Sequence, residues 1–221
     1  MNKKLLIFDL DGTIADTLNT IRDAVNMCME HFGFEKLNYE QTRQRVGNGV
    51  RALIEQALPE KSDISEERFE EILAYFRSCY LLTHDKIDGC YDGLYEVMTA
   101  LRSKEYKLAV LSNKPDNLVG GIVKKLFGER FFVAAMGQTE LPRKPDPTVP
   151  LMIAREQGTE LEDCYFIGDS EVDVQTAKNS GMHAVAVSWG FRERSVLEAS
   201  EPEVIIDTPA ELLDLFESLD S

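Results

Sequence analysis

The chain has 221 residues, of which 43% are hydrophobic and 29% charged, a composition typical of a globular protein. Its apolar runs are all shorter than the roughly 20 residues that a membrane-spanning helix needs. The formal net charge of −15 repels nucleic-acid phosphates and anionic lipid surfaces, so we expect neither nucleic acid nor a membrane as partner. The short apolar run near the start is interrupted by two aspartates and does not resemble a secretory signal, which favours a cytoplasmic protein.

Short apolar runs along the chain predict buried parallel strands. They cover residues 5–8, 108–111, 132–135, 164–167 and 184–187, with 204–206 as an edge strand. Between the later runs, apolar residues recur at helical spacing, as in 94–101 and 118–126. Alternation of strand and helix predicts an α/β fold, a doubly wound, Rossmann-like parallel sheet with right-handed crossovers.

The interval 15–87 breaks this alternation. It contains no convincing strand, and its apolar residues form helical stripes, one within 18–32 and another within 69–80. An interval of this length is far too long for a single crossover connection. The sequence therefore predicts two units: an α/β catalytic core formed by 1–14 and 88–221, and an inserted α-helical cap domain formed by 15–87.

Polar residues follow three of the predicted strands. They are Asp9 and Asp11 after the first, Ser112 and Asn113 after the second, and Asp169 and Asp173 after the fourth. Ligands of open α/β sheets bind beyond the carboxyl ends of the strands, so we expect these side chains at one edge of the sheet. Lys144, in an Arg-Lys-Pro-Asp-Pro segment before a predicted helix, is placed to reach the same edge.

Such a group of carboxylates needs a counter-charge. Asp9, Asp11, Asp169 and Asp173 would repel one another and raise one or more of their pKa values. A hard divalent cation relieves this repulsion, and Mg²⁺ typically uses one or two carboxylates, waters and a substrate phosphate. Calcium prefers more ligands, and zinc prefers His or Cys, which are not close by in the sequence. The pattern favours Mg²⁺ as cofactor.

A cation together with Lys144 makes the site suitable for a phosphate monoester. Asp9 can attack phosphorus and form an aspartyl-phosphate, while Asp11 can protonate the leaving oxygen and later deprotonate water. Ser112, together with backbone N–H groups around Asn113, can donate hydrogen bonds to the phosphoryl oxygens. Lys144 supplies positive charge to the transferring group.

Four sequence motifs together resemble those of the haloacid dehalogenase superfamily. They are F-D-L-D-G-T at 8–13, S-N at 112–113, K-P at 144–145 and G-D-S-x-x-D at 168–173. The resemblance covers the whole chain, and the insertion looks like the helical cap of that superfamily. Dehalogenases of the superfamily generally lack the second aspartate of the first motif. The presence of Asp11 therefore argues for a phosphatase, a phosphoric monoester hydrolase.

The resemblance also implies a role for each matching residue. Asp9 resembles the nucleophile and Asp11 the general acid and base, while Ser112 and Lys144 resemble the phosphate-binding residues. The Mg²⁺ ligands would be Asp9, the backbone carbonyl of Asp11, and Asp169. Asp173 looks like a partner that supports the metal from the second shell or through water.

The cap contributes a further motif. Residues 46–54, with Gly47, Gly49 and Arg51, resemble the G-x-G loop and following helix of bacterial phosphoglycolate phosphatases. This implies a small phosphorylated metabolite as substrate, with Arg51 as a candidate contact for its carboxylate. An exposed helix arginine is an equally good interpretation of Arg51, and the two glycines can simply permit a turn.

Several alternatives stay open at this point. Pyrophosphatases, nucleotide or sugar-phosphate phosphatases and β-phosphoglucomutase-like mutases of the superfamily share much of the pattern. Outside the class, a non-catalytic binding protein on the same fold is the alternative. The sequence is compatible with a monomer or a homodimer.

Overall fold

The structure is a computed structural model that describes residues 3–59, 64–84 and 86–219. A six-stranded sheet with the order β3-β2-β1-β4-β5-β6 forms its centre, and every neighbouring pair is parallel. The strands are β1 (Leu5–Phe8), β2 (Lys107–Pro115), β3 (Ala134–Gln138), β4 (Cys164–Gly168), β5 (His183–Val187) and β6 (Val204–Ile206). The expected doubly wound α/β fold is confirmed.

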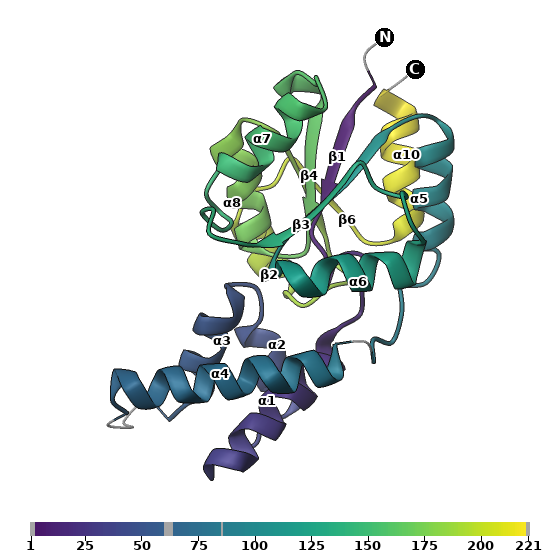
Figure 1. Ribbon diagram of the computed structural model, residues 1–221. Coiled ribbons are helices and arrows are strands. Elements are labelled where there is room, and N and C mark those ends of the chain that lie inside the picture. Colours follow the sequence, from purple (N-terminus) through teal and green to yellow (C-terminus); the bar gives the residue numbers. More distant parts are fainter. Residues whose placement is uncertain (1–2, 60–63, 85, 220–221) are drawn as a thin grey trace.

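Helices cover both faces of the sheet (Figure 1). On one face lie α5 (Leu94–Ser103), α6 (Asp116–Phe127) and α10 (Pro209–Leu219), which share an apolar cluster with Leu6 and Phe8 of β1. On the other lie α7 (Thr148–Glu156), α8 (Glu171–Ser180) and α9 (Arg194–Ala199), packed with Leu5 and Ile7. A short 3₁₀ helix (Leu161–Asp163) precedes β4. Because alternate residues of a strand point to opposite faces, an uninterrupted apolar run such as β1 suits a sheet covered on both sides.

Four helices form the inserted unit beyond the carboxyl ends of the strands (Figure 1). They are α1 (Leu18–Phe32), α2 (Tyr39–Arg45), α3 (Gly49–Ala57) and α4 (Glu66–Thr83). Asn38 begins α2 with a capping box to Gln41, and α1 ends at Gly33 in the left-handed conformation. The apolar stripes of α1 and α4 face each other in a cluster of their own, which also includes Leu118 and Phe191 of the core.

The chain passes between the core and the cap twice, and the two connecting segments lie side by side. Asp16 donates its N–H to the carbonyl of Gly89 over 2.9 Å, and Asp88 donates to the carbonyl of Asp16 over 3.3 Å. The four cap helices fall within the interval 15–87. We propose that this antiparallel pairing marks the boundary between the two units and acts as the hinge of the cap.

The edge strand β3 differs from the sequence prediction. The prediction placed it at 132–135, whereas it covers Ala134–Gln138. Phe132 does not extend the ladder, because it packs with Phe127 and Phe131 in an aromatic group beside the sheet. The ladder instead continues through Gly137 and Gln138, whose side chains carry no strand signal. Within the part of the chain that is described, no helix combines the length and apolar character that crossing a bilayer requires.

The cap cluster gives a stability prediction. Phe76 of α4 is fully buried in it, so Phe76→Ala should lower the free energy of unfolding by about 3–5 kcal/mol through lost burial and the remaining cavity. Leu82 is a matched control in the same helix because it is 66% exposed, and Leu82→Ala should change stability by at most about 0.5 kcal/mol. Urea unfolding followed by circular dichroism measures both. Equal losses in the two variants would contradict the packing described here.

Candidate active site

The centre of the candidate site lies where three adjacent strands end. Asp9 follows β1, Ser112 stands near the end of β2, and Asp169 follows β4. In the ladders, Phe8 of β1 pairs with Val110 and with Ile167, so all three side chains leave the sheet at nearly the same level. Asp9 extends the ladder by donating its N–H to the carbonyl of Ile167 over 2.9 Å. The sequence prediction that these residues share one edge agrees with this register.

Three carboxylates and one ammonium are buried together at this edge. Asp9, Asp169 and Asp173 each offer an oxygen within 4.8 Å of the others, and none of these residues is more than 7% exposed. Lys144 Nζ lies 2.8 Å from Asp9 Oδ1 and 2.7 Å from Asp173 Oδ1. The lysine therefore compensates two of the three carboxylates at once.

Burial and mutual repulsion change the pKa values in this group. Burial raises the pKa of Asp9 to about 7, although Lys144 opposes the shift. Burial, followed by the charges of Asp173 and Asp9, raises the pKa of Asp169 to about 8. Burial by itself would lower the pKa of Lys144, but the neighbouring carboxylates of Asp173 and Asp9 outweigh it and hold that pKa above its usual value. Full ionisation of Asp9 and Asp169 is therefore unfavourable unless a further positive charge is bound.

Backbone and side-chain hydrogen bonds fix the positions of Lys144 and Asp173. Asn113 accepts the N–H of Lys144 at Oδ1 (3.0 Å) and donates through Nδ2 to the Lys144 carbonyl (3.1 Å). Asp173 forms a capping box with Ser170 at the start of α8, and Ser170 Oγ donates to Asp173 Oδ2 over 2.6 Å. Since Nδ2 also donates to the carbonyl of Gly47, both N–H donors of the Asn113 side chain are used, and its backbone N–H is the donor left for a phosphate contact.

Asp169 is held by two loops that approach it closely. Thr13 Oγ1 donates to Asp169 Oδ1 over 3.0 Å, and the N–H of Phe191 donates to Oδ2 over 2.7 Å. Gly12 has a φ of 87°, and a Cβ at this position would lie 2.4 Å from Asp169 Oδ2. Glycine at position 12 is therefore required both by the backbone conformation and by the position of the Asp169 carboxylate.

These residues fit a magnesium ion. Although Lys144 Nζ is close to Asp9 Oδ1, that oxygen receives no hydrogen bond of acceptable geometry from the described residues. The cluster offers only oxygen ligands, which is the donor set that Mg²⁺ prefers. Asp9 and Asp169 are placed to hold the ion, with Asp173 close by. The side chain of Asp11 lies outside this cluster, so only its backbone carbonyl is left as the ligand that the resemblance implies.

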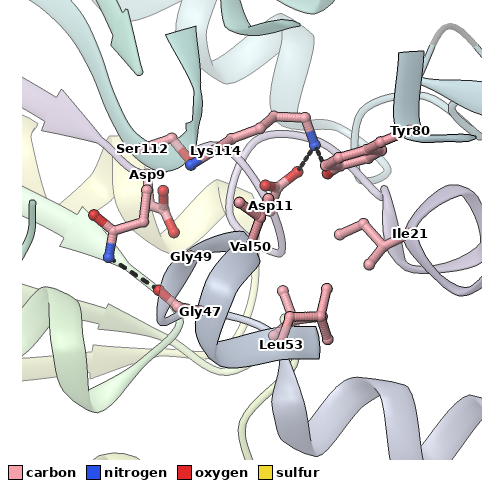
Figure 2. A pocket seen from close by; sticks show the side chains of 12 residues that line it. Asp9, Asp11, Ile21, Gly47, Gly49, Val50, Leu53, Tyr80, Ser112 and Lys114 are labelled. Atoms are coloured by element: carbon pink, nitrogen blue, oxygen red, sulfur yellow. Dashed lines mark hydrogen bonds and ion pairs between the residues drawn. The ribbon is translucent and has the colours of Figure 1, made fainter. Parts of the chain in front are cut away.

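The side chain of Asp11 belongs to a second ion pair (Figure 2). Its Oδ1 lies 2.8 Å from Lys114 Nζ and accepts a hydrogen bond from Thr17 Oγ1 over 2.7 Å. Lys114 Nζ also bonds the hydroxyl of Tyr80, a cap residue, and lies 4.5 Å from the centre of its ring. Burial, reinforced by Asp11, raises the pKa of Tyr80 well above its ordinary value, so the phenol is neutral. The core and the cap are thus in direct contact beside Asp11, through Lys114 and Tyr80.

The cap loop 46–49 closes the pocket from the other side. Gly47 and Gly49 line the cavity together with the apolar residues Ile21, Val46, Val50 and Leu53. Three core side chains donate hydrogen bonds to backbone carbonyls of this loop: Asn113 to Gly47 (3.1 Å), Arg143 to Asn48 (2.9 Å) and Arg192 to Val46 (2.8 Å). The loop is therefore held against the carboxyl edge of the sheet.

Comparison with known proteins agrees with this architecture. Residues 6–187 match the model of the haloacid dehalogenase-like hydrolase family. The chain belongs to this family. A phosphoglycolate phosphatase of Pseudomonas aeruginosa is 33% identical over 95% of this chain and 78% of its own length. One of Vibrio vulnificus is 30% identical over 96% of this chain and 95% of its own.

A crystal structure gives the same result. It comes from Haemophilus somnus 129pt, is described as that of a predicted phosphoglycolate phosphatase, and superimposes with a TM-score of 0.90 at 25% identity. The match covers 97% of this chain and 98% of the other. The expectation of a haloacid dehalogenase-type phosphatase, a phosphoric monoester hydrolase similar to phosphoglycolate phosphatases, is confirmed.

Not every residue singled out from the sequence lies at this site. Arg51 is 42% exposed, pairs with Glu55, Glu66 and Glu70, and does not line the pocket. It follows the pocket-lining Val50 by one position, and the rotation of about 100° per helical residue carries it onto another face of α3. The structure therefore favours the alternative interpretation of Arg51 as an exposed helix arginine.

Two polar residues of the pocket, Lys114 and Tyr80, were given no role from the sequence. Lys114 lies next to the S-N motif, and its spacing of two from Ser112 on a strand was a usable signal that both face the same way. Tyr80 gave no such signal, because it belongs to the apolar stripe of α4 and looks like an ordinary core residue.

The raised carboxylate pKa values predict how Mg²⁺ affects stability. In the metal-free protein, the pKa values of Asp9 (about 7) and Asp169 (about 8) exceed the ordinary 3.8. The stability linked to these two groups is therefore present at low pH and is lost as the pH rises through about 7 and 8. Bound Mg²⁺ favours the ionised carboxylates and offsets this loss. The increase in Tm on adding Mg²⁺ should therefore be larger near pH 8.5 than near pH 6.

Thermal unfolding with EDTA and with excess Mg²⁺, at both pH values, measures this increase. Asp169→Asn is the control, because it removes a charge and a candidate ligand with little change in shape, and its increase should be small at both pH values. An increase of equal size at the two pH values in the wild type would contradict the assignment, as would a wild-type-sized increase in the variant.

Proposed function

We propose that this protein is a Mg²⁺-dependent phosphatase that hydrolyses a small phosphate monoester, with phosphoglycolate as the leading candidate, through an aspartyl-phosphate intermediate. One observation carries the proposal. The buried carboxylate of Asp9 stands at the end of the central strand β1, is held by Lys144 over 2.8 Å, and lies within 4.8 Å of the oxygens of Asp169 and Asp173. The names of the relatives described above support the choice of substrate.

In the proposed first step, Asp9 attacks phosphorus. A carboxylate oxygen of Asp9 forms the new bond to phosphorus while the bond from phosphorus to the ester oxygen breaks. Bound Mg²⁺ would neutralise charge on the phosphoryl oxygens and reduce its repulsion with the attacking carboxylate. Lys144 restrains Asp9 and would supply positive charge to the transferring group, and Ser112, which lines the pocket, can donate a hydrogen bond to one of its oxygens.

Asp11 handles the proton in both steps. Its carboxyl group gives a proton to the departing ester oxygen, and its carboxylate later takes one from the water that attacks the aspartyl-phosphate. The hydrogen bond from Thr17 and the contact with Lys114 both go to Oδ1, which leaves Oδ2 for the proton transfer. Hydrolysis releases inorganic phosphate and restores Asp9.

The cap encloses the reacting groups. Its loop 46–49 and the apolar residues Ile21, Val50 and Leu53 form the wall opposite Asp9, so that closure excludes bulk water. Opening at the Asp16–Gly89 pairing would release the products. The proposal includes a cytoplasmic setting and a monomer or homodimer, and light scattering coupled to size-exclusion chromatography decides between the two oligomeric states.

A substrate screen tests the proposed function. Purified protein should release inorganic phosphate from phosphoglycolate in the presence of Mg²⁺, faster than from most of a panel of roughly a hundred phosphate esters, and EDTA should abolish the release. A mutase would return the phosphoryl group to an organic acceptor, and a binding protein would release none from any ester. Either result would contradict the proposal.

Two substitutions separate the roles of the first-motif aspartates. Asp9→Asn should lower kcat by at least about 10³-fold, because the amide has nearly the same shape but is a poor nucleophile. Asp11→Asn should lower kcat by about 10²–10⁴-fold and let a phosphorylated enzyme accumulate, because the acid and base is lost while the nucleophile remains. Steady-state phosphate release and acid-quenched labelling measure the two effects.

Asp23→Asn serves as the control for the same chemical change, since Asp23 is an exposed residue of α1 and should tolerate it. An Asp9→Asn variant that keeps a large fraction of the wild-type kcat would rule out the covalent mechanism. Rapid turnover by Asp11→Asn would contradict the role given to Asp11.

A further inference from the structure

The pocket has a second end, away from Asp9, whose chemistry the hydrolysis of a phosphoryl group does not explain. There the side chain of Lys114 is only 1% exposed. Lys114 is the one cationic side chain among the residues that line this pocket. Removing an ammonium from water is costly unless it is paired, so a buried lysine in a pocket wall with apolar neighbours needs a partner or a ligand.

The partners of Lys114 within the protein leave part of its capacity unused. Its ammonium has three N–H donors. Among the described residues, two are used, by Asp11 Oδ1 at 2.8 Å and by the hydroxyl of Tyr80. Only one of these partners is an anion, because the phenol of Tyr80 is neutral. One donor therefore remains for a ligand.

Lys144, by contrast, has both of its contacts with carboxylates, so its charge is compensated at the phosphoryl end. It lies within 2.8 Å of two carboxylates, Asp9 and Asp173. The nearby arginines are also engaged: Arg143 with the carbonyl of Asn48, and Arg192 with Glu171 and the carbonyl of Val46. Lys114 is thus the cation best placed to contact the leaving group of the substrate.

The positions of Ser112 and Lys114 indicate the direction in which the leaving group of the substrate would extend. Ser112 and Lys114 are two residues apart on β2, where the ladder with β3 is irregular between Leu111 and Pro115, and both line the pocket. A phosphoryl group beside Ser112 would therefore direct its ester substituent past Asp11 toward Lys114 and Tyr80. The apolar residues Val50 and Leu53 line the same cavity and suit a methylene group.

The size of the cavity limits the substituent. It encloses about 40 Å³, enough for only a few water-sized groups. This small space suits a short leaving group with one anionic end better than a sugar or a nucleoside. Lys114 would then contact that anion while keeping Asp11 as its second partner.

We propose that Lys114, held in place by Tyr80, determines substrate specificity by binding a carboxylate carried by a short leaving group. This inference rests on the proposed phosphatase function and goes beyond it by assigning the recognition of the leaving group to a core lysine and a cap tyrosine. It also replaces Arg51 as the cationic contact, since Arg51 lies outside the pocket. Because Tyr80 belongs to the cap, the contact forms only when the cap is closed.

The test compares two esters of similar length. Phosphoglycolate carries a carboxylate on its leaving group, whereas 2-hydroxyethyl phosphate carries a neutral hydroxyl. Lys114→Met keeps much of the side-chain volume and removes the charge, and it should lower the ratio of kcat/KM for phosphoglycolate to kcat/KM for 2-hydroxyethyl phosphate by at least about 10-fold. Both values can fall, because Lys114 also contacts Asp11, so the ratio is the quantity that decides.

Two further variants complete the test. Tyr80→Phe removes the hydroxyl that positions Lys114 and should lower the same ratio by a smaller factor, and this variant decides the question if Lys114→Met does not fold. Arg51→Ala is the matched control for loss of a cation outside the pocket, and it should leave the ratio unchanged.

The possible failures point to different conclusions. A wild-type protein that hydrolyses both esters equally well overturns this inference while the phosphatase function stands. An equal loss on both esters in Lys114→Met also overturns it, because the lysine would then act only through Asp11. If the wild type hydrolyses no phosphate ester at all, the proposed function itself fails.

Discussion

Three buried carboxylates, of which two contact one lysine, determine much of the arrangement at the carboxyl edge of the sheet. If Asp9, Asp169 and Asp173 are all ionised, Lys144 leaves two negative charges uncompensated, which a divalent cation would balance. Much of the local structure serves to hold this unfavourable group together. Three parallel strands present the carboxylates at one edge, Gly12 allows a close approach to Asp169, and helix α8 fixes Asp173 through its capping box. The fold thus maintains a concentration of negative charge that a bound cation would stabilise.

In the proposed mechanism, the two lysines of the site contact different parts of the substrate. Lys144 lies with the carboxylates at the phosphoryl end, whereas Lys114 lies with Tyr80 where the leaving group would be. The contacts of Lys144 lie entirely within the core, whereas the contact of Lys114 with Tyr80 requires the cap. Chemistry and selectivity are therefore separated in the chain. A cap that packs differently can change the leaving group accepted without disturbing the carboxylates that transfer the phosphoryl group.

The sequence predicted those features that depend on strand ends. Because parallel strands bring their carboxyl ends to one edge, the positions of Asp9, Ser112 and Asp169 followed from the apolar runs before them. Features that depend on how the cap docks could not be predicted in this way. The pattern of α3 does not tell which of its faces meets the core, so Arg51 was a candidate for the pocket although it pairs with glutamates outside it. Tyr80 has the spacing of a core residue, and only the docked cap places its hydroxyl against Lys114.

We propose that Asp9 becomes covalently phosphorylated during turnover. It is tested most directly by quenching the wild-type protein during turnover, reducing it with borohydride and locating the modified residue by mass spectrometry of its peptides. Borohydride converts an aspartyl-phosphate to homoserine, so we expect homoserine at position 9 in samples that contain both substrate and Mg²⁺. Homoserine at another aspartate, or an unmodified position 9 under conditions of rapid turnover, would contradict it.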